Sequence, residues 1–103
     1  MTAETALKNK IKIALSKRGY IPIPMIRGRF FTSDGRPIST GLPSGCSDIL
    51  FIQPETGRCV WIETKIYPRK PTAEQERFIH IMQQQGCIAG VCYTVNDAIK
   101  MVE

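Results

Sequence analysis

The sequence contains no apolar run that approaches the roughly 20 residues of a membrane-spanning helix. Its first residues include Glu4 and scattered lysines, which is not the pattern of a secretory signal peptide. Internal repeats and low-complexity segments are also missing. These absences argue against integral membrane and repeat proteins. We therefore expect a single domain over residues 1–103, with no membrane partner and a cytoplasmic location.

The four cysteines lack the CxxC spacing that marks the common zinc sites. An even number of cysteines permits disulfides, but without secretory features we expect reduced thiols that are buried or half-buried. A zinc site formed by Cys87, Cys92 and the single histidine, His80, is a minor alternative, because its spacing does not match the common zinc fingers.

Acidic residues are scarce in the first third of the chain. Residues 8–36 contain eight basic residues and one acidic residue, whereas residues 37–103 contain six basic and seven acidic residues. The net charge of +5 is therefore concentrated on one part of the chain. Such a distribution is typical of a surface that binds a phosphate backbone, although a basic face that only aids solubility is the alternative. The candidate phosphate contacts are Arg27, Arg29, Arg36, Arg69 and Lys70.

The residues best suited to chemistry lie in the stretch GCSDILFIQPETGRCVWIETK, residues 45–65. Residues 48–52 and 59–65 are rich in β-branched and aromatic residues and are bounded by Pro and Gly, which predicts two antiparallel strands. With residues 54–57 as the loop, Asp48 lies opposite Glu63. Glu63 and Lys65 share one face of their strand, because side chains alternate between the two faces.

Two carboxylates on facing strands have Cβ atoms only about 5 Å apart. They would repel each other, and one would take up a proton unless a cation compensated the charge. A hard divalent cation such as Mg²⁺ or Mn²⁺, which prefers oxygen ligands, is the natural compensation. Lys65 would then lie where it can hold an attacking water or offset charge that develops on a phosphate.

This order of residues resembles the PD-(D/E)xK nuclease signature, in which an acidic residue begins one strand and Glu-x-Lys follows in the next. It resembles more specifically the virus-type replication-repair nuclease (VRR-NUC) family, over nearly the whole chain. The motifs that carry the resemblance are GCSD (45–48), IETK (62–65), TAEQ (72–75) and GCIAGV (86–91). One departure is Ser47, which stands where the signature has proline.

The resemblance implies a restriction-endonuclease-like core: an α/β (α+β) fold with a mixed β-sheet flanked by helices, in the order α-β-β-β-α-β-α. The residue patterns predict the same elements. Residues 20–24 contain two prolines and are not expected to form a regular central strand. The last strand should run parallel to the strand 59–65, because a helix connects the two. The expected helices are 3–18, 73–85 and 95–102, and the expected strands are 25–32, 48–52, 59–65 and 88–94.

The resemblance also implies a metal-dependent DNA endonuclease. Asp48 and Glu63 would hold the metal together with the Thr64 carbonyl, and Lys65 would act on the water or the phosphate. Two further residues would support the site: Glu4, which points toward the core side of the first helix, and Gln75, in the first turn of the second. The alternatives are that Glu4 only favours the helix dipole and that Gln75 is only compatible with a helix.

Stand-alone members of this family are implied to be homodimers, similar to Holliday-junction resolvases, that cut branched DNA such as a four-way junction. A paired set of sites suits paired incisions. A phage or prophage source, and hence the bacterial host cytoplasm, is also implied. The alternatives are a non-catalytic DNA-binding module, a subunit of a replication or repair complex, and a flap or nicking nuclease.

Overall fold

The structure is a computed structural model and describes residues 1–25, 30–39 and 41–103. Residues 26–29 and 40 lie outside the described ranges. Within these ranges the elements follow in the order α1 (Ala3–Ser16), β1 (Ile21–Ile23), β2 (Phe30–Phe31), β3 (Pro37–Ile38), β4 (Ile49–Ile52), β5 (Cys59–Thr64), α2 (Ala73–Gln84), β6 (Ile88–Cys92) and α3 (Val95–Val102).

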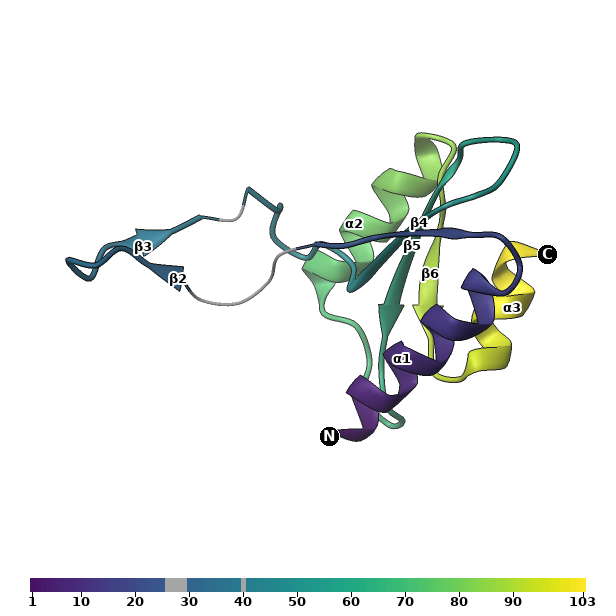
Figure 1. Cartoon of the computed structure of the whole chain (residues 1–103), viewed down its shortest axis with the longest axis horizontal. Coiled ribbons are helices and arrows are strands. Elements are labelled where there is room, and N and C mark those ends of the chain that lie inside the picture. Colours follow the sequence, from purple (N-terminus) through teal and green to yellow (C-terminus); the bar gives the residue numbers. More distant parts are fainter. Residues whose placement is uncertain (26–29, 40) are drawn as a thin grey trace.

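A mixed four-stranded sheet forms the centre of the molecule, in the order β1-β4-β5-β6 (Figure 1). β4 is antiparallel to both of its neighbours, whereas β5 and β6 are parallel. α2 packs on one face of the sheet, and α1 and α3 lie together on the other (Figure 1). The predicted fold class, a mixed sheet flanked by helices, is confirmed.

The predicted pairing of the two central strands is confirmed at every position of the ladder. Ile49 pairs with Ile62 at one end and Ile52 with Cys59 at the other. Asp48 therefore comes directly before β4, and Lys65 comes directly after β5. The parallel pairing of β5 with β6 is also as predicted, because α2 provides the crossover between them.

The first strand of the sheet is not where the sequence predicts it. β1 is Ile21–Ile23, inside the proline-containing segment, and it lies at the edge of the sheet beside β4. An edge strand needs hydrogen bonds on one side only, so Pro22 is tolerated there. Of the strand expected at 25–32, Phe30–Phe31 form β2, but β2 pairs with β3 in a separate ribbon and not with the main sheet. Residues 26–29 of this expected strand lie outside the described ranges. β3 itself falls between the strands expected at 25–32 and 48–52, where the sequence predicts no strand.

The helix boundaries follow from side-chain caps. Thr2 and Thr72 are the N-caps of α1 and α2, and each hydroxyl accepts a hydrogen bond from a backbone N–H three residues later. β6 ends two residues earlier than expected, because Thr94 serves as the N-cap of α3 and accepts a hydrogen bond from the Asp97 N–H.

The main core lies between the sheet and the helices α1 and α3. Its fully buried members come from the sheet and from both of these helices, namely Ile11, Leu15, Phe51, Val60, Ile62, Cys92 and Ala98. On the opposite face, Trp61 and Phe78 make an edge-to-face contact with ring centroids 5.0 Å apart. All four cysteines are free thiols, two buried and two half-buried, as predicted. In the described part of the chain, no helix is both long enough and apolar enough to cross a membrane.

Candidate active site

Three carboxylates converge at the end of the sheet where β5 finishes. Asp48 directly precedes β4, Glu63 is the second-last residue of β5, and Glu4 lies in the first turn of α1. One oxygen from each side chain lies within 4.8 Å of the others. In the described ranges this is the one set of at least three potential metal ligands that meets so closely. The structure thus brings together Asp48, Glu63 and Glu4, which the sequence predicts as site residues.

The Asp48 carboxylate is held in place by the strand that faces it. The backbone N–H and the hydroxyl of Thr64 both donate hydrogen bonds to Asp48 Oδ2, each at 2.9 Å. Thr64 is fully buried, so both bonds are shielded from water. Asp48 Oδ1 is not involved in these two bonds and is the oxygen that faces Lys8. The carboxylate is therefore oriented by Thr64 before any ligand arrives.

Gly45 fixes the path of the chain into Asp48. Its φ angle is +78°, which favours glycine, and a Cβ at this position would overlap the carbonyl oxygen of Glu74 in α2. The turn that carries Asp48 is consequently packed backbone to backbone against the start of α2. This contact explains why a glycine precedes the acidic residue by three positions.

Two lysines neutralise much of the charge of the carboxylates. Lys65 Nζ lies 3.8 Å from Glu63 Oε2, as expected for a cation on the same strand face. Lys8 Nζ lies 3.7 Å from Asp48 Oδ1 and 3.9 Å from Glu4 Oε1. Sequence reasoning missed Lys8, although it stands four residues after Glu4 and therefore on the same side of the helix.

The electrostatics of the site centre on Asp48. Burial would raise the pKa of its carboxyl, but a hydrogen bond with the Glu63 side chain, the two hydrogen bonds from Thr64 and the charge of Lys8 outweigh burial. The pKa of Asp48 is therefore lowered from its usual value. Glu63 is only 2% exposed, and Lys65 is the cation beside its carboxylate.

Gln75 and Thr64 take part in structural contacts. The Gln75 side-chain oxygen accepts a hydrogen bond from the Thr72 N–H at 2.8 Å, which completes a capping box at the start of α2. A role in the site would therefore have to use the NH₂ group of Gln75. The carbonyl role expected for Thr64 and the catalytic role expected for Gln75 stay predictions.

The basic residues expected to bind DNA are spread over separate surfaces. Arg36 lies on the β2–β3 ribbon and pairs with Asp34 at 3.0 Å. Arg69 and Lys70 are exposed in the connection between β5 and α2. Arg27 and Arg29 lie outside the described residues.

Comparison with known proteins supports the architecture. A solved structure titled "VRR_NUC domain" matches with a TM-score of 0.70, over 99% of this chain and 96% of that chain, at 20% sequence identity. The chain has the VRR_NUC fold. No family model matches the sequence, and no curated protein matches it.

Because the VRR_NUC likeness extends over nearly the whole of both chains, the position of each element around the site is accounted for by the fold. At 20% identity the likeness shows the fold alone. The chemistry of the site therefore depends on the side chains that this chain places there. Three carboxylates that present oxygens around one point are the donor set that hard divalent cations prefer.

Proposed function

We propose that the protein is a metal-dependent DNA endonuclease. The observation that carries the proposal is the convergence of Glu4, Asp48 and Glu63 from three separate elements. Burying a carboxylate such as Glu63 is unfavourable unless a cation or a proton compensates its charge. A surface that only binds DNA would gain nothing from acidic groups at this position, because they repel phosphates. A site that holds a divalent cation requires them.

Each residue has a distinct part in this proposal. Asp48, Glu63 and Glu4 would hold Mg²⁺ or Mn²⁺, with the Thr64 carbonyl as a further ligand. The bound ion would lower the pKa of a coordinated water and offset negative charge on the phosphate. The Thr64 hydroxyl and N–H keep Asp48 oriented. The Lys65 ammonium, beside Glu63, is placed to hold the water or to stabilise charge on the phosphate oxygens.

The proposed substrate is branched DNA, such as a four-way junction. The excess of basic residues in the first third of the chain supports a nucleic-acid partner. Arg69 and Lys70 are exposed where they can reach phosphates outside the site, and Arg36 is exposed and paired with Asp34. The candidate contacts are basic side chains suited to phosphates, and phosphate contacts carry no sequence information directly. We therefore propose that DNA shape is recognised.

We further propose that the protein acts as a homodimer, supported by an apolar surface on the β2–β3 arm (residues 30–39). The arm projects from the body (Figure 1), and Phe30, Phe31 and Ile38 on it are exposed. The radius of gyration is 14.4 Å, whereas a compact domain of this size has about 13 Å. Exposed apolar side chains gathered on one projecting element are typical of an interaction surface.

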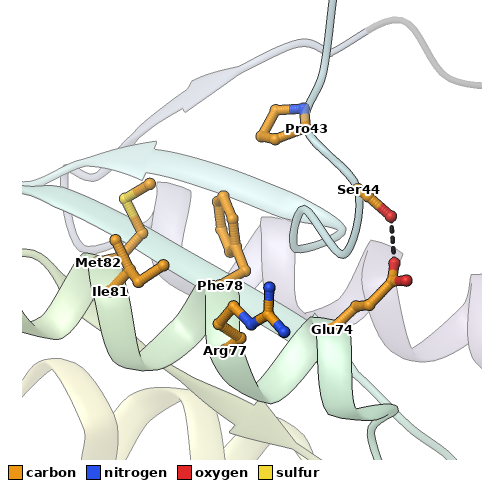
Figure 2. A pocket seen from close by; sticks show the side chains of 7 residues that line it. All are labelled: Pro43, Ser44, Glu74, Arg77, Phe78, Ile81 and Met82. Atoms are coloured by element: carbon orange, nitrogen blue, oxygen red, sulfur yellow. Dashed lines mark hydrogen bonds between the residues drawn. The ribbon is translucent and has the colours of Figure 1, made fainter.

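The same chain offers a complementary surface at the base of the arm, the α2 groove. Figure 2 shows Phe78, Ile81 and Met82 directed from α2 toward the segment that carries Pro43 and Ser44. The hollow between them is about 420 Å³, and the Ser44 hydroxyl donates a hydrogen bond to Glu74 across its rim. In the proposed dimer, the arm of each copy covers the α2 groove of the other. The two sites would then be paired by a two-fold axis.

Cleavage assays test the proposed activity. Labelled four-way junction, flap, single-stranded and linear duplex DNA would be incubated with Mg²⁺ or Mn²⁺ and either the wild type or a variant. We expect junction cleavage that falls about 100-fold or more in Lys65→Ala and Glu63→Gln. The matched control is Glu55→Gln, the same change at an exposed residue in the β4–β5 turn, and its activity should equal that of the wild type.

The pattern of cleavage separates the alternatives. Metal-dependent cutting of the flap or of nicked duplex in preference to the junction would keep the site and replace the substrate. Tight DNA binding without cutting of any form would favour a binding module or a subunit of a larger complex. Cutting that is unchanged in Glu63→Gln would reject this site.

A further inference from the structure

Lys8 occupies the position of a counter-ion inside the acidic cluster. Its ammonium lies between Asp48 Oδ1 and Glu4 Oε1, at 3.7 Å and 3.9 Å, and the residue sits on α1 one turn after Glu4. The side chain is 29% exposed, so it has a path to solvent. A divalent cation held by the same carboxylates would meet the Lys8 ammonium at close range. The two positive charges would repel each other. The Lys8 ammonium would move away, because it is at the end of a long flexible side chain, whereas the cation would be held by the carboxylates.

Lys12 lies one turn further along the same side of α1. It is exposed, and it lines a hollow of about 330 Å³ together with Asp48, Leu50 and the β1 residues Pro22 and Ile23. Residues four apart are neighbours on a helix surface, separated by about 6 Å along the axis. The hollow therefore has Asp48 of the acidic cluster in its wall and a lysine beside it. A chain of phosphates that approached the cluster along this side would meet Lys12 and then Lys8.

We propose that Lys8 and Lys12 form a phosphate-binding track for the DNA strand, and that Lys8 joins the track only when a divalent cation displaces it from Asp48 and Glu4. The inference rests on the proposed function for the identity of the anion as DNA backbone. Before the cation binds, Lys8 stabilises the carboxylates against their mutual repulsion. After displacement, its charge is available to the phosphate next to the metal site. Lys12 holds the neighbouring phosphate in both states.

Metal affinity in the absence of DNA tests the displacement. Mn²⁺ binding to the whole protein would be measured by calorimetry for wild type, Lys8→Met, Lys8→Arg and Lys10→Met. Removing the competing charge in Lys8→Met should raise the Mn²⁺ affinity roughly two- to tenfold. Lys8→Arg keeps the charge and should stay near the wild type. Lys10→Met is the matched control, because Lys10 is exposed and about 200° around the helix from Lys8.

DNA affinity with and without a cation tests the track. Binding would be measured in EDTA and in Ca²⁺, with gels to confirm that the DNA stays intact. Lys8→Met should weaken DNA binding in Ca²⁺ and have little effect in EDTA. In Ca²⁺ it should also reduce, by about 1, the slope of the logarithm of the binding constant against the logarithm of the salt concentration. Lys12→Met should weaken binding in both conditions and leave the Mn²⁺ affinity unchanged. Lys10→Met should change neither quantity by a comparable amount.

The outcomes are separable from those of the cleavage assay. An unchanged or lower Mn²⁺ affinity in Lys8→Met would overturn the displacement, and thermal unfolding in EDTA would confirm that the variant is folded. Equal effects of Lys12→Met and Lys10→Met on DNA binding would overturn the track. If the wild type cuts no DNA form, the proposed function fails. The comparison of the Mn²⁺ affinities of Lys8→Met and Lys10→Met would still show whether the cation displaces Lys8.

Discussion

Cys92 is a residue whose burial has a measurable consequence for stability. Its thiol belongs to the main core, and burial, together with the negative charge of Asp97, raises its pKa to about 12. The ordinary value is 9.0. Below pH 9 the thiol is neutral in both the folded and the unfolded chain, so it adds no pH dependence. As the pH rises from 9 toward 12, the unfolded chain releases this proton and the folded chain does not. Folding is therefore disfavoured over this range.

We expect the wild type to lose about 1.4 kcal/mol of unfolding free energy between pH 8 and pH 10 through this residue alone. Urea unfolding at both pH values would measure the loss, and Cys92→Ala removes the group that titrates. Subtracting the change in unfolding free energy of Cys92→Ala from that of the wild type removes the contribution of the other ionisable groups. An equal loss in Cys92→Ala would show that the thiol is not the cause.

Individual site residues differ in how far the sequence predicts them. Asp48 and Glu63 follow from strand alternation and a loop of known length, because both are local properties of one hairpin. The helical phase of Glu4 directs it toward the core side of the first helix, whereas its role in the site is implied only by the resemblance to the VRR-NUC family. The ion pair of Lys8 with Asp48 does not follow, because it depends on how α1 lies relative to the sheet. The packing of the whole core decides that arrangement.

At the scale of elements, the turn before β4 depends on Gly45. Replacing it with alanine adds a Cβ that overlaps the backbone of α2 at a φ angle of +78°. We expect Gly45→Ala to destabilise the fold by about 2–5 kcal/mol, from left-handed strain plus overpacking. Because the turn must shift, Asp48 moves relative to Glu63, and the Mn²⁺ affinity should fall as well. Urea unfolding and calorimetry would measure the two effects.

Gly57→Ala is the matched control for this prediction. Gly57 has a similar φ of +73°, in the turn between β4 and β5, but a Cβ there would meet no atom within 4 Å. Its substitution should therefore add only the strain of the left-handed conformation, about 1–2 kcal/mol. Mn²⁺ affinity should not change. Equal destabilisation by the two substitutions would mean that the contact with α2 is not important.

The elements also show why one strand was misplaced. The β4–β5 hairpin is predictable because its two strands are adjacent in sequence and its turn residues set the register. β1 is stabilised by pairing with β4, which is remote in sequence, and its prolines argue against a strand until its edge position is known. Long-range pairing of this kind leaves little local signal. The apolar residues of the arm also belong to no part of the core, since Phe30, Phe31 and Ile38 are exposed.

At the scale of the whole molecule, the exposed apolar arm and the apolar α2 groove are two surfaces that a dimer would bury. The arm cannot cover the groove of its own chain, because it projects away from the body (Figure 1). If each arm covers the groove of a second copy, Phe31→Ser and Ile81→Asp should both weaken the dimer. Sedimentation velocity at micromolar concentration would measure this. Ile13→Ser is a matched control for Phe31→Ser, since both residues are 57% exposed. His80→Asp is the control for Ile81→Asp, because His80 is its exposed neighbour on α2.

Mixing the two variants gives the sharpest form of the prediction. A dimer of one Phe31→Ser copy and one Ile81→Asp copy contains one arm and one groove that are both intact, whereas neither variant alone forms any intact contact. We therefore expect two solutions of monomers to form a mixed dimer when they are combined. Arms that paired only with each other would give no such recovery, and a monomeric wild type would reject the dimer. Since the paired sites depend on the dimer, junction cleavage should recover in the mixture in step with its dimer fraction.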